Sequence, residues 1–534
     1  MGKRKNQEVL QTYKNIKTDT FDFERIALLL SSSDDTDAHQ VIPYSTLHDL
    51  DFEEVFMYLD RTCSKIGQQH LYSVLRTIPK NQDRTLRFEK IIDNLNANPD
   101  LKKSSILEMS RLDQYGAYYL QSLFNGKNIT KPKWFWIVPI LSILATISAI
   151  ASFIFPVFII VFLLILGVNQ MIHYWNKNNV ISYSNSIPQL LTLNQVAKSM
   201  PNSGVILDAD HDISKSNDAL SEIANKALFF KWESRLTGEI GQFVDILLDL
   251  IKASFLLEPI LMFKIIKELD RKRIEIQHVF RTVAEVDVAL SIDSFRDGLA
   301  YYTKPNISER KKSFSSEDIY HPLILNPVTN SLNISHGQSV LLSGSNMSGK
   351  TTFIRTIGIN AILAQTINTA CAKKFTIPKI KIHSAIRITD NLLDESSYYY
   401  EEVKAIKKLI NESESEDQNL FLLDELFKGT NTVERISSGK AVLSYLNQND
   451  NIVLAATHDL ELTEFLRDSY KYLHFTETIE NDKFSFDYKL KEGVLINTNA
   501  IRILEINDFP KQLTEEAKAI AKQFRNAKRN SNEG

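Results

Sequence analysis

The sequence predicts a mainly parallel α/β domain in its C-terminal part, preceded by an all-α region that a transmembrane helical hairpin interrupts. Three observations predict this organisation. After residue 311, apolar runs alternate with helical patterns, which is typical of a mainly parallel sheet covered by helices. Before residue 311, apolar side chains mostly recur at helical intervals. Within that helical part, residues 134–176 contain no Asp, Glu, Lys or Arg.

The composition argues against several classes of protein. A chain of 534 residues is too long for a single core, so we expect about three or four structural units. The net charge of -3 gives no overall basic bias, which argues against coating nucleic acid by charge alone. Two cysteines, Cys63 and Cys371, are too few for a disulfide framework and suit a reducing compartment. No apolar stretch follows the polar residues Met1–Gln7, so no cleavable signal peptide is expected.

Changes in residue pattern predict four regions. They are a helical region, a membrane hairpin, a second helical region and the α/β domain, at residues 1–130, 131–176, 177–310 and 311–534. The last boundary falls in a segment rich in helix breakers, Lys304–Asn330, which contains three prolines.

The uncharged stretch predicts two membrane spans. As one helix, residues 134–176 would be roughly 65 Å long, twice the hydrocarbon thickness of a bilayer. Two spans therefore fit, with Pro156 near the midpoint marking the turn. Lysines flank both ends, and aromatic residues stand where a headgroup layer would lie: Lys127, Lys131, Lys133 and Lys177, and Trp134, Trp136, Tyr174 and Trp175. Positive flanks place both ends on the cytoplasmic side. We therefore expect a protein of the cell membrane with two spans, anchored through residues 134–175, whose α/β domain is cytoplasmic.

Two other structures compete for this stretch. One is a hairpin buried in a large helical domain, although long uncharged apolar runs are the usual membrane signal. The other is a shallow re-entrant loop, because Phe153–Val157 lacks polar turn residues. A second apolar region, Phe243–Phe263, is interrupted by charges at short intervals and is expected to be one long helix in a soluble core.

Residues Gly344–Thr351 match the phosphate-binding pattern G-x-x-x-x-G-K-[ST]. An apolar strand-like run precedes them and a helical pattern follows, which is the context that the motif requires. In this arrangement backbone N–H groups and the helix N-terminus face the phosphates. Lys350 is expected to reach the β- and γ-phosphates, and Thr351 to offer its hydroxyl to Mg²⁺. The predicted nucleotide contacts from this segment are Gly344, Ser345, Asn346, Met347, Ser348, Gly349, Lys350, Thr351 and Thr352.

Two acidic residues, Asp424 and Glu425, end the apolar run Asn419–Leu423. A buried parallel strand delivers such residues to the edge of the sheet where phosphates bind. We expect Asp424 to hold Mg²⁺, directly or through water, together with Thr351. Glu425 is expected to orient or deprotonate the attacking water. The alternative is an acidic pair that opens an ordinary surface helix.

A third apolar run, Ile452–Ala456, leads into Thr457 and His458. A histidine at this edge can sense the γ-phosphate or the attacking water, so His458 is a second candidate catalytic residue. A lone histidine after a strand is more often structural, and the two preceding elements favour the functional interpretation.

These segments resemble the MutS family of mismatch-repair ATPases. SGSNMSGKTTF at Ser343–Phe353 is similar to the family's TGPNMGGKST, and LLDELFKGTNT at Leu422–Thr432 to its LLDELGRGTST. ATHD at Ala456–Asp459 resembles the family's ATH switch. The resemblance implies a phosphate-loop NTPase domain, ATP as the nucleotide, Mg²⁺ as the metal and ATP hydrolysis as the activity.

Fainter likeness extends to the helical region. Leu59–Thr62 with Gly67, and Ala284–Ser291, resemble two ends of the family's lever region, which would begin at about residue 48. His321-Pro322 is similar to the pair that precedes the family's nucleotide domain. The resemblance also implies a homodimer with composite ATP sites, in which Ser397 serves the neighbouring subunit's ATP. Glu395 stands where that signature segment has glycine.

Three functional hypotheses follow. The first is a membrane-anchored, dimeric MutS-like ATPase whose hydrolysis drives lever movement. The second is action on branched or damaged DNA, although the family's mismatch-reading domain has no counterpart here. Basic clusters that could contact phosphates are Lys3–Lys5, Arg271–Arg273 and Arg310–Lys312. The third is a non-catalytic nucleotide switch that serves a membrane partner without binding DNA.

Overall fold

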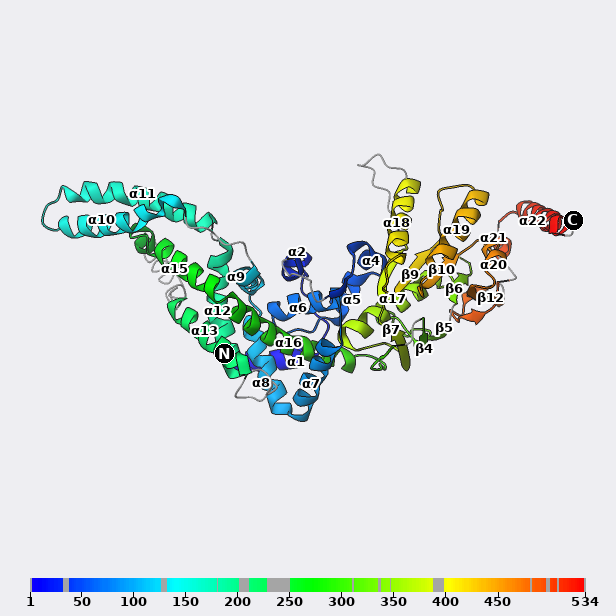
Figure 1. The fold of residues 1–534 in the computed structure, drawn as a ribbon, viewed down its shortest axis with the longest axis horizontal. Helices are drawn as coiled ribbons and strands as arrows, with labels where there is room; N and C mark the ends of the chain where they lie inside the picture. Colours follow the sequence, from blue (N-terminus) through cyan, green and yellow to red (C-terminus); the bar gives the residue numbers. More distant parts are fainter. Residues whose placement is uncertain are drawn as a thin grey trace. The chain divides into compact units, whose positions relative to one another are not determined.

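The computed structural model describes residues 2–31, 38–125, 132–179, 181–200, 211–227, 250–309, 312–334, 338–345, 347–387, 398–480, 483–495, 500–506 and 509–532 (Figure 1). The chain divides into two compact units, which we call the helical unit and the sheet unit. The helical unit contains Met1–Thr36, Leu59–Val74 and Leu86–Gly298. The sheet unit contains Asp37–Tyr58, Leu75–Thr85 and Leu299–Gly534. The boundaries of these two units differ from those of the four regions predicted from sequence. The four regions remain a prediction about domain organisation.

The helical unit is built from helices throughout its described residues. Those lying wholly or mostly in it are α1 (Gly2–Thr12), α2 (Phe23–Ile26), α3 (Leu28–Ser31), α6 (Lys65–Arg76), α7 (Asp83–Ala97), α8 (Pro99–Met109), α9 (Ser122–Asn125), α10 (Ile137–Ala151), α11 (Phe158–Asn179), α12 (Ile181–Ser199), α13 (His211–Ala227), α15 (Leu257–Arg271) and α16 (Arg273–Asp297). Short 3₁₀ turns are η1 (Ser110–Leu112), η2 (Tyr115–Tyr119) and η3 (Lys133–Trp136).

The sheet unit combines helices with strands. Its helices are α4 (Tyr44–Asp49), α5 (Phe52–Leu59), α17 (Lys350–Ile367), α18 (Tyr398–Ser413), α19 (Thr432–Leu446), α20 (Leu462–Phe465), α21 (Ala500–Ile506) and α22 (Lys511–Asn532). Its strands are β1 (Ala38–Val41), β2 (Thr77–Pro79), β3 (Asn306–Ser308), β4 (Phe314–Ile319), β5 (Asn330–Ile334), β6 (Ser339–Ser343), β7 (Lys374–Pro378), β8 (Lys381–Ala385), β9 (Asn419–Asp424), β10 (Ile452–Thr457), β11 (Tyr470–His474), β12 (Glu477–Glu480), β13 (Lys483–Phe486) and β14 (Lys491–Glu492).

The central sheet has the strand order β14-β11-β6-β10-β9-β8. Five of these strands are parallel, and β14 pairs antiparallel with β11 at one edge. A second sheet, ordered β3-β7-β4-β5, is mixed. In the central sheet β6, β10 and β9 are neighbours, so their C-terminal ends meet at one edge. That edge is where a parallel sheet presents a ligand site.

Alternate residues of β9 face two different helical layers. Phe421 and Leu423 belong to a buried cluster that also contains residues of α18, α19 and α20. Leu422 points the other way, where Gly358 of α17 approaches so closely that an added Cβ would lie 2.6 Å from Leu422 Cδ1. Side chains alternate between the two faces of a strand, so helices cover both faces of this sheet.

Helices α10 and α11 lie side by side and form a hairpin whose turn, residues 152–157, contains the predicted turn residue Pro156 (Figure 1). Two segments in this region, Lys133–Ala151 and Phe158–Trp175, are long and apolar enough to cross a membrane. Only 22% of the first and 11% of the second is buried in the protein. The indole rings of Trp134 and Trp175 meet edge to face at the base, with centroids 4.9 Å apart.

A helix break lies beside this hairpin. Leu256 adopts a left-handed conformation (φ 50°), so the described part of the predicted helix Phe243–Phe263 is interrupted just before α15. The prediction of one continuous helix is therefore wrong here, and residues 243–249 lie outside the described part of the chain. The carbonyl of Ser254 accepts a hydrogen bond from Asn169 Nδ2 of α11 at 2.6 Å. Such side-chain donors satisfy carbonyls that a broken helix leaves unpaired.

Two segments that resemble lever sequences meet in the helical unit. Asp287 of α16 accepts hydrogen bonds from the backbone N–H of Cys63 at 2.7 Å and from that of Ser64 at 2.8 Å. The Ser64 hydroxyl donates a third, at 2.5 Å. Burial raises the pKa of the Asp287 carboxyl to about 6, although these hydrogen bonds lower it.

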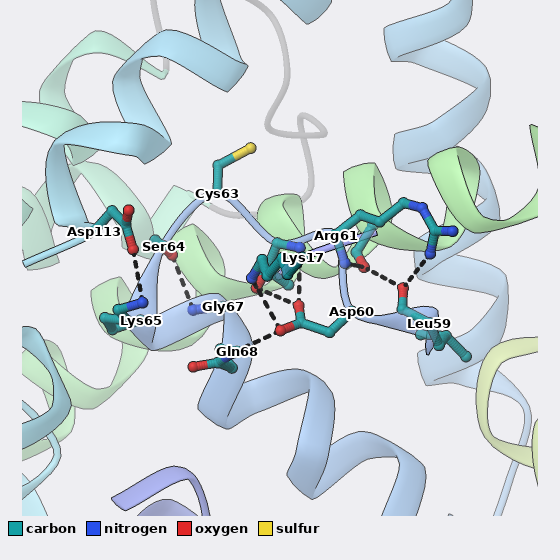
Figure 2. A network of polar contacts seen from close by, with 12 residues as sticks. Lys17, Leu59, Asp60, Arg61, Cys63, Ser64, Lys65, Gly67, Gln68 and Asp113 are labelled. Carbon is teal, nitrogen blue, oxygen red and sulfur yellow. Dashed lines mark hydrogen bonds and ion pairs between the residues drawn. The ribbon is translucent and has the colours of Figure 1, made fainter. Parts of the chain in front are cut away.

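A second buried carboxylate, Asp60, lies in the same turn (Figure 2). It accepts hydrogen bonds from Lys17 Nζ at 2.9 Å and from Gln68 Nε2 at 2.6 Å. Arg61 donates to the carbonyl of Leu59 at 3.2 Å. The segment joining α5 to α6 is thus fixed by buried charge-assisted hydrogen bonds, which explains its distinctive sequence.

Candidate nucleotide site

The phosphate-loop motif connects a buried strand to a long helix. Strand β6 is buried along its whole length, and α17 begins at Lys350. Gly344 (φ 152°) and Gly349 (φ 107°) both have positive φ, which favours glycine. A Cβ on Gly344 would also lie 2.8 Å from the carbonyl oxygen of Phe475. The loop therefore needs glycine at these two motif positions.

Lys350 is folded back onto its own loop. Its Nζ donates hydrogen bonds to the carbonyl oxygens of Gly344 at 2.8 Å and Ser345 at 2.9 Å. Burial lowers the pKa of Lys350, and the nearby carboxylates of Glu425 and Asp424 raise it. Met347 is 83% exposed with φ 68°, whereas Ser348 is buried. Asn346, a predicted contact, lies outside the described residues.

Thr351 and Asp424 come together at the end of β9. The Thr351 hydroxyl donates to Asp424 Oδ2 at 2.5 Å. The other oxygen of this carboxylate, Oδ1, is buried and has no hydrogen-bond partner among the described residues. Burial raises the pKa of Asp424, and the Thr351 hydrogen bond lowers it. A hydroxyl beside a carboxylate with an unpaired oxygen is a donor set that suits Mg²⁺.

The Glu425 carboxylate contacts two side chains at the end of the same strand. Its Oε1 lies 2.5 Å from His458 Nε2, and its Oε2 lies 3.0 Å from Lys428 Nζ. The hydrogen bond from His458 is the largest cause that lowers the pKa of Glu425 to about 2. Glu425 has a positive φ of 54° and donates its N–H to Ala456 O in β10 at 3.0 Å. The carboxylate is therefore held ionised between strands β9 and β10.

A cavity of about 600 Å³ lies over these elements. Among the predicted residues, those lining it are Ser345, Met347, Gly349, Lys350, Thr351, Thr352 and Glu425. Glu425 also lines a second cavity of about 220 Å³, together with Lys428, Arg435, His458 and Asp459. His458 thus reaches the first cavity through Glu425. Ser397 and the rest of the signature segment, residues 388–397, lie outside the described residues.

Part of the cavity wall was missing from the sequence prediction. Phe475 and Tyr488 line the cavity from the segments after β11 and β13, and Tyr320 with His321 lines it from the segment after β4. Of these four residues, only His321 belongs to a sequence motif, the His-Pro pair that resembles the one preceding the family's nucleotide domain. The aromatic residues lie far from the motifs in sequence, so no local pattern indicated them.

A buried acid near the N-terminal end of the chain also supports the sheet unit. Asp49 accepts hydrogen bonds from the Ser384 hydroxyl and from the backbone N–H of Ile386 and Arg387, at 2.6, 3.0 and 2.8 Å. Asp51 pairs with Arg355 of α17 at 2.8 Å and with Arg387 at 2.6 Å. The sequence pattern predicts that this segment is the start of the lever-like region, and it indicates no role for Asp49 or Asp51.

Comparison with known proteins supports the resemblance stated above. Residues 340–525 match the model of MutS domain V. The DNA mismatch repair protein MutS of Listeria welshimeri is 28% identical over 307 residues, which cover 55% of this chain and 35% of that protein. The protein of the same name from Thermus thermophilus is 29% identical over 266 residues, which cover 48% of this chain and 32% of that protein.

The matched part spans about a third of the length of these relatives. MutS domain V is a phosphate-loop ATPase domain, and its match begins at Val340, in the strand that leads into the phosphate loop. The predicted family is confirmed. The chain is a divergent member of the MutS family, which it matches over about half of its own length.

Proposed function

We propose that the chain binds ATP with Mg²⁺ in the 600 Å³ cavity and hydrolyses it. The observation that carries this proposal is the meeting of three motif elements from neighbouring parallel strands. Lys350, Thr351 and Glu425 line one cavity at this edge of the sheet. Asp424 accepts a hydrogen bond from Thr351, and His458, which follows β10, contacts Glu425.

Each residue has a role that its geometry supports. Lys350 can exchange its two loop carbonyls for phosphate oxygens, because those bonds lie within the loop that would wrap the triphosphate. Thr351 and Asp424 would hold Mg²⁺ through the hydroxyl and the unpaired Oδ1. Bound Mg²⁺ would neutralise charge on the phosphates. Glu425, which is ionised, would accept a proton from water, and His458 would orient its carboxylate.

We further propose that α10 and α11 anchor the protein in the cell membrane, with the sheet unit in the cytoplasm. A core hairpin would bury most of its apolar surface, whereas these helices leave large side chains exposed at the turn, such as Phe153 at 92% and Ile154 at 70%. The aromatic pair at the base suits a headgroup layer. This exposure argues against the buried-core alternative.

A homodimer with composite ATP sites and a DNA ligand complete the proposal. Both rest on the family and on the names of the relatives, which are DNA mismatch repair proteins. Size-exclusion chromatography with light scattering, with and without Mg·ATP, tests the dimer. Anisotropy titrations with homoduplex, mismatched and branched DNA test whether the protein binds DNA. Absence of salt-dependent binding would refute the proposed DNA ligand.

A second candidate is a nucleotide switch without turnover that serves a membrane partner. One observation favours it: both oxygens of Glu425 already have side-chain partners, His458 and Lys428. A carboxylate that kept both partners in the nucleotide complex would accept a proton from water poorly.

Two variants of the detergent-purified protein decide between these functions. Lys350→Ala is expected to abolish nucleotide binding. Glu425→Ala is expected to retain binding and to lower the steady rate of phosphate release about 100-fold or more. Lys374→Ala is the control, since this lysine is exposed in the same unit and pairs only at the surface with Glu317. Wild-type phosphate release no faster than that of Glu425→Ala would establish the switch instead.

A further inference from the structure

Helix α18 buries one carboxylate against the loop that follows Glu425. Glu402 is 0% exposed, and its Oε1 accepts a hydrogen bond from the backbone N–H of Phe427. Burial raises the pKa of Glu402, while the backbone N–H groups of Phe427, Lys428 and Gly429 lower it. The amide of Phe427 is thus bonded to one oxygen of this carboxylate, and the other oxygen, Oε2, is buried with no hydrogen-bond partner among the described residues.

This loop has the conformation of an anion-binding nest. Phe427 adopts a left-handed conformation with φ 60°, which non-glycine residues rarely take. A left-handed residue within a turn directs successive N–H groups toward one point, where an anion binds. Here the anion is supplied by the protein itself, from Glu402. Tyr399 of the same helix adds a ring contact to Phe427, with centroids 6.3 Å apart.

The nest connects directly to Glu425. Lys428 follows Phe427 directly in the chain, and its Nζ lies 3.0 Å from Glu425 Oε2. Glu425 itself has a positive φ of 54°. Two non-glycine residues in left-handed conformations within three positions persist only when their surroundings hold them. Glu402 is the buried group that holds this segment from the side of α18.

We propose that Glu402 is a positioning residue, which sets the orientation of the Glu425 carboxylate by holding the backbone of residues 427–429. It acts through Phe427 and Lys428 and has no contact of its own with the nucleotide cavity. This inference rests on the proposed hydrolysis at that cavity. It links α18, the helix that begins right after residues 388–397, to the residue expected to activate water.

The test compares Glu402→Gln with Glu401→Gln in the full-length protein. Glutamine keeps the size of the side chain but loses the charge that the amides stabilise. Glu401 lies on the same helix and pairs with Lys404 at 2.9 Å, away from the nest. We expect Glu402→Gln to lower kcat about 10-fold or more, with the Kd for a fluorescent ATP analogue changed less than about two-fold. Glu401→Gln is expected to match the wild type in both.

Hydrogen exchange of a peptide covering residues 425–430 provides a readout that needs no activity. It should be faster in Glu402→Gln than in Glu401→Gln, with exchange in α17 unchanged. An unchanged kcat, or equal losses of kcat and nucleotide binding, overturns the positioning role. If the wild type binds nucleotide without hydrolysing it, the proposed function fails. In that case hydrogen exchange of residues 425–430 tests only whether Glu402 holds this loop. Equal exchange in Glu402→Gln and Glu401→Gln would show that it does not.

Discussion

Gly67 and Asp287 are in such close contact that a Cβ atom on the glycine would lie 2.1 Å from Asp287 Oδ2. The Cβ of Asp287 would lie only 2.8 Å away, so rotating the carboxylate would not relieve the clash. Asp287 is also fixed by its hydrogen bonds from Cys63 and Ser64. Because Gly67 lies on α6 and Asp287 on α16, this contact sets how closely the two helices approach.

The first prediction concerns this contact. Gly67→Ala is expected to destabilise the protein by about 2–3 kcal/mol, because neither the helix backbone nor the hydrogen-bonded carboxylate can move cheaply. Gly167→Ala is the matched control, since it also lies in a helix of the helical unit and an added Cβ there meets nothing within 4 Å. Thermal unfolding in one detergent measures both. Equal melting temperatures for the two variants would show that the contact is not tight.

The second prediction is a pH dependence that originates at Asp287. Burial raises its pKa from 3.8 to about 6. A raised pKa means that this group favours the folded state below its ordinary pKa and that the contribution is lost as the pH rises through about 6. Two pKa units correspond to about 3 kcal/mol.

The Asp287→Asn variant isolates this contribution. Asparagine does not titrate in this pH range. Its side chain is a weaker hydrogen-bond acceptor than a carboxylate, but the resulting change in the free energy of unfolding does not depend on pH. We expect the unfolding free energy of the wild type, minus that of Asp287→Asn, to fall by up to about 3 kcal/mol between pH 4 and pH 7. Urea titrations at four pH values measure it. A difference that stays constant or rises with pH contradicts the assigned shift.

The sequence predicted the parts of the site that are contiguous in the chain. The glycines and Lys350 belong to one short motif, and Asp424 with Glu425 directly follows an apolar strand, so local patterns were sufficient. The hairpin with its turn at Pro156 was predicted for the same reason, because charge is absent over a continuous stretch.

Contacts between distant segments could not be predicted in this way. Asp49 and Arg387 are separated by 338 positions, and a carboxylate in a polar segment resembles an ordinary solvated face. The strand β1 was missed because its four residues, AHQV, show no clear alternation. Phe427 takes a left-handed conformation, and its N–H donates to Glu402, which lies 25 positions earlier in the chain. Such features depend on tertiary packing, which overrides local preference.

The third prediction tests the metal site. Asp424→Asn replaces the oxygen pair by one oxygen and one nitrogen, so it weakens any bond to Mg²⁺ while keeping the size of the side chain. Calorimetric titration with ATP is expected to show that Mg²⁺ strengthens binding to the wild type about 10-fold more than to the variant. Affinity in EDTA should be similar for both proteins.

Asp417→Asn is the control for this experiment. Asp417 is a partly exposed carboxylate of the same unit that pairs with Lys381 at 2.6 Å, away from the cavity. It should respond to Mg²⁺ as the wild type does. If Asp424→Asn kept the full response, Asp424 would have no part in metal binding, and its unpaired Oδ1 would need another explanation.

The last prediction decides whether the hairpin crosses the bilayer or enters it from one side. The segments Lys133–Ala151 and Phe158–Trp175 have 19 and 18 residues, so each is about 27–29 Å long as a helix, close to the hydrocarbon thickness. A crossing hairpin therefore places Phe153, in the turn, at the far headgroup layer. The indoles at the base would then lie at the near layer.

Tryptophan fluorescence in vesicles of brominated lipids measures this depth. The four native tryptophans are replaced by phenylalanine, and Phe153→Trp supplies the single probe. Retaining Trp134 alone instead gives the matched control at the base. For a crossing hairpin, bromines near the headgroups quench both probes best. In vesicles whose sheet unit faces outward, iodide trapped inside then quenches only the Phe153→Trp probe. A re-entrant hairpin gives strongest quenching of the turn probe by bromines near the bilayer centre. A turn probe that no brominated lipid quenches would exclude membrane insertion. The side chain of Phe153, which is 92% exposed in the protein, would then contact something other than lipid.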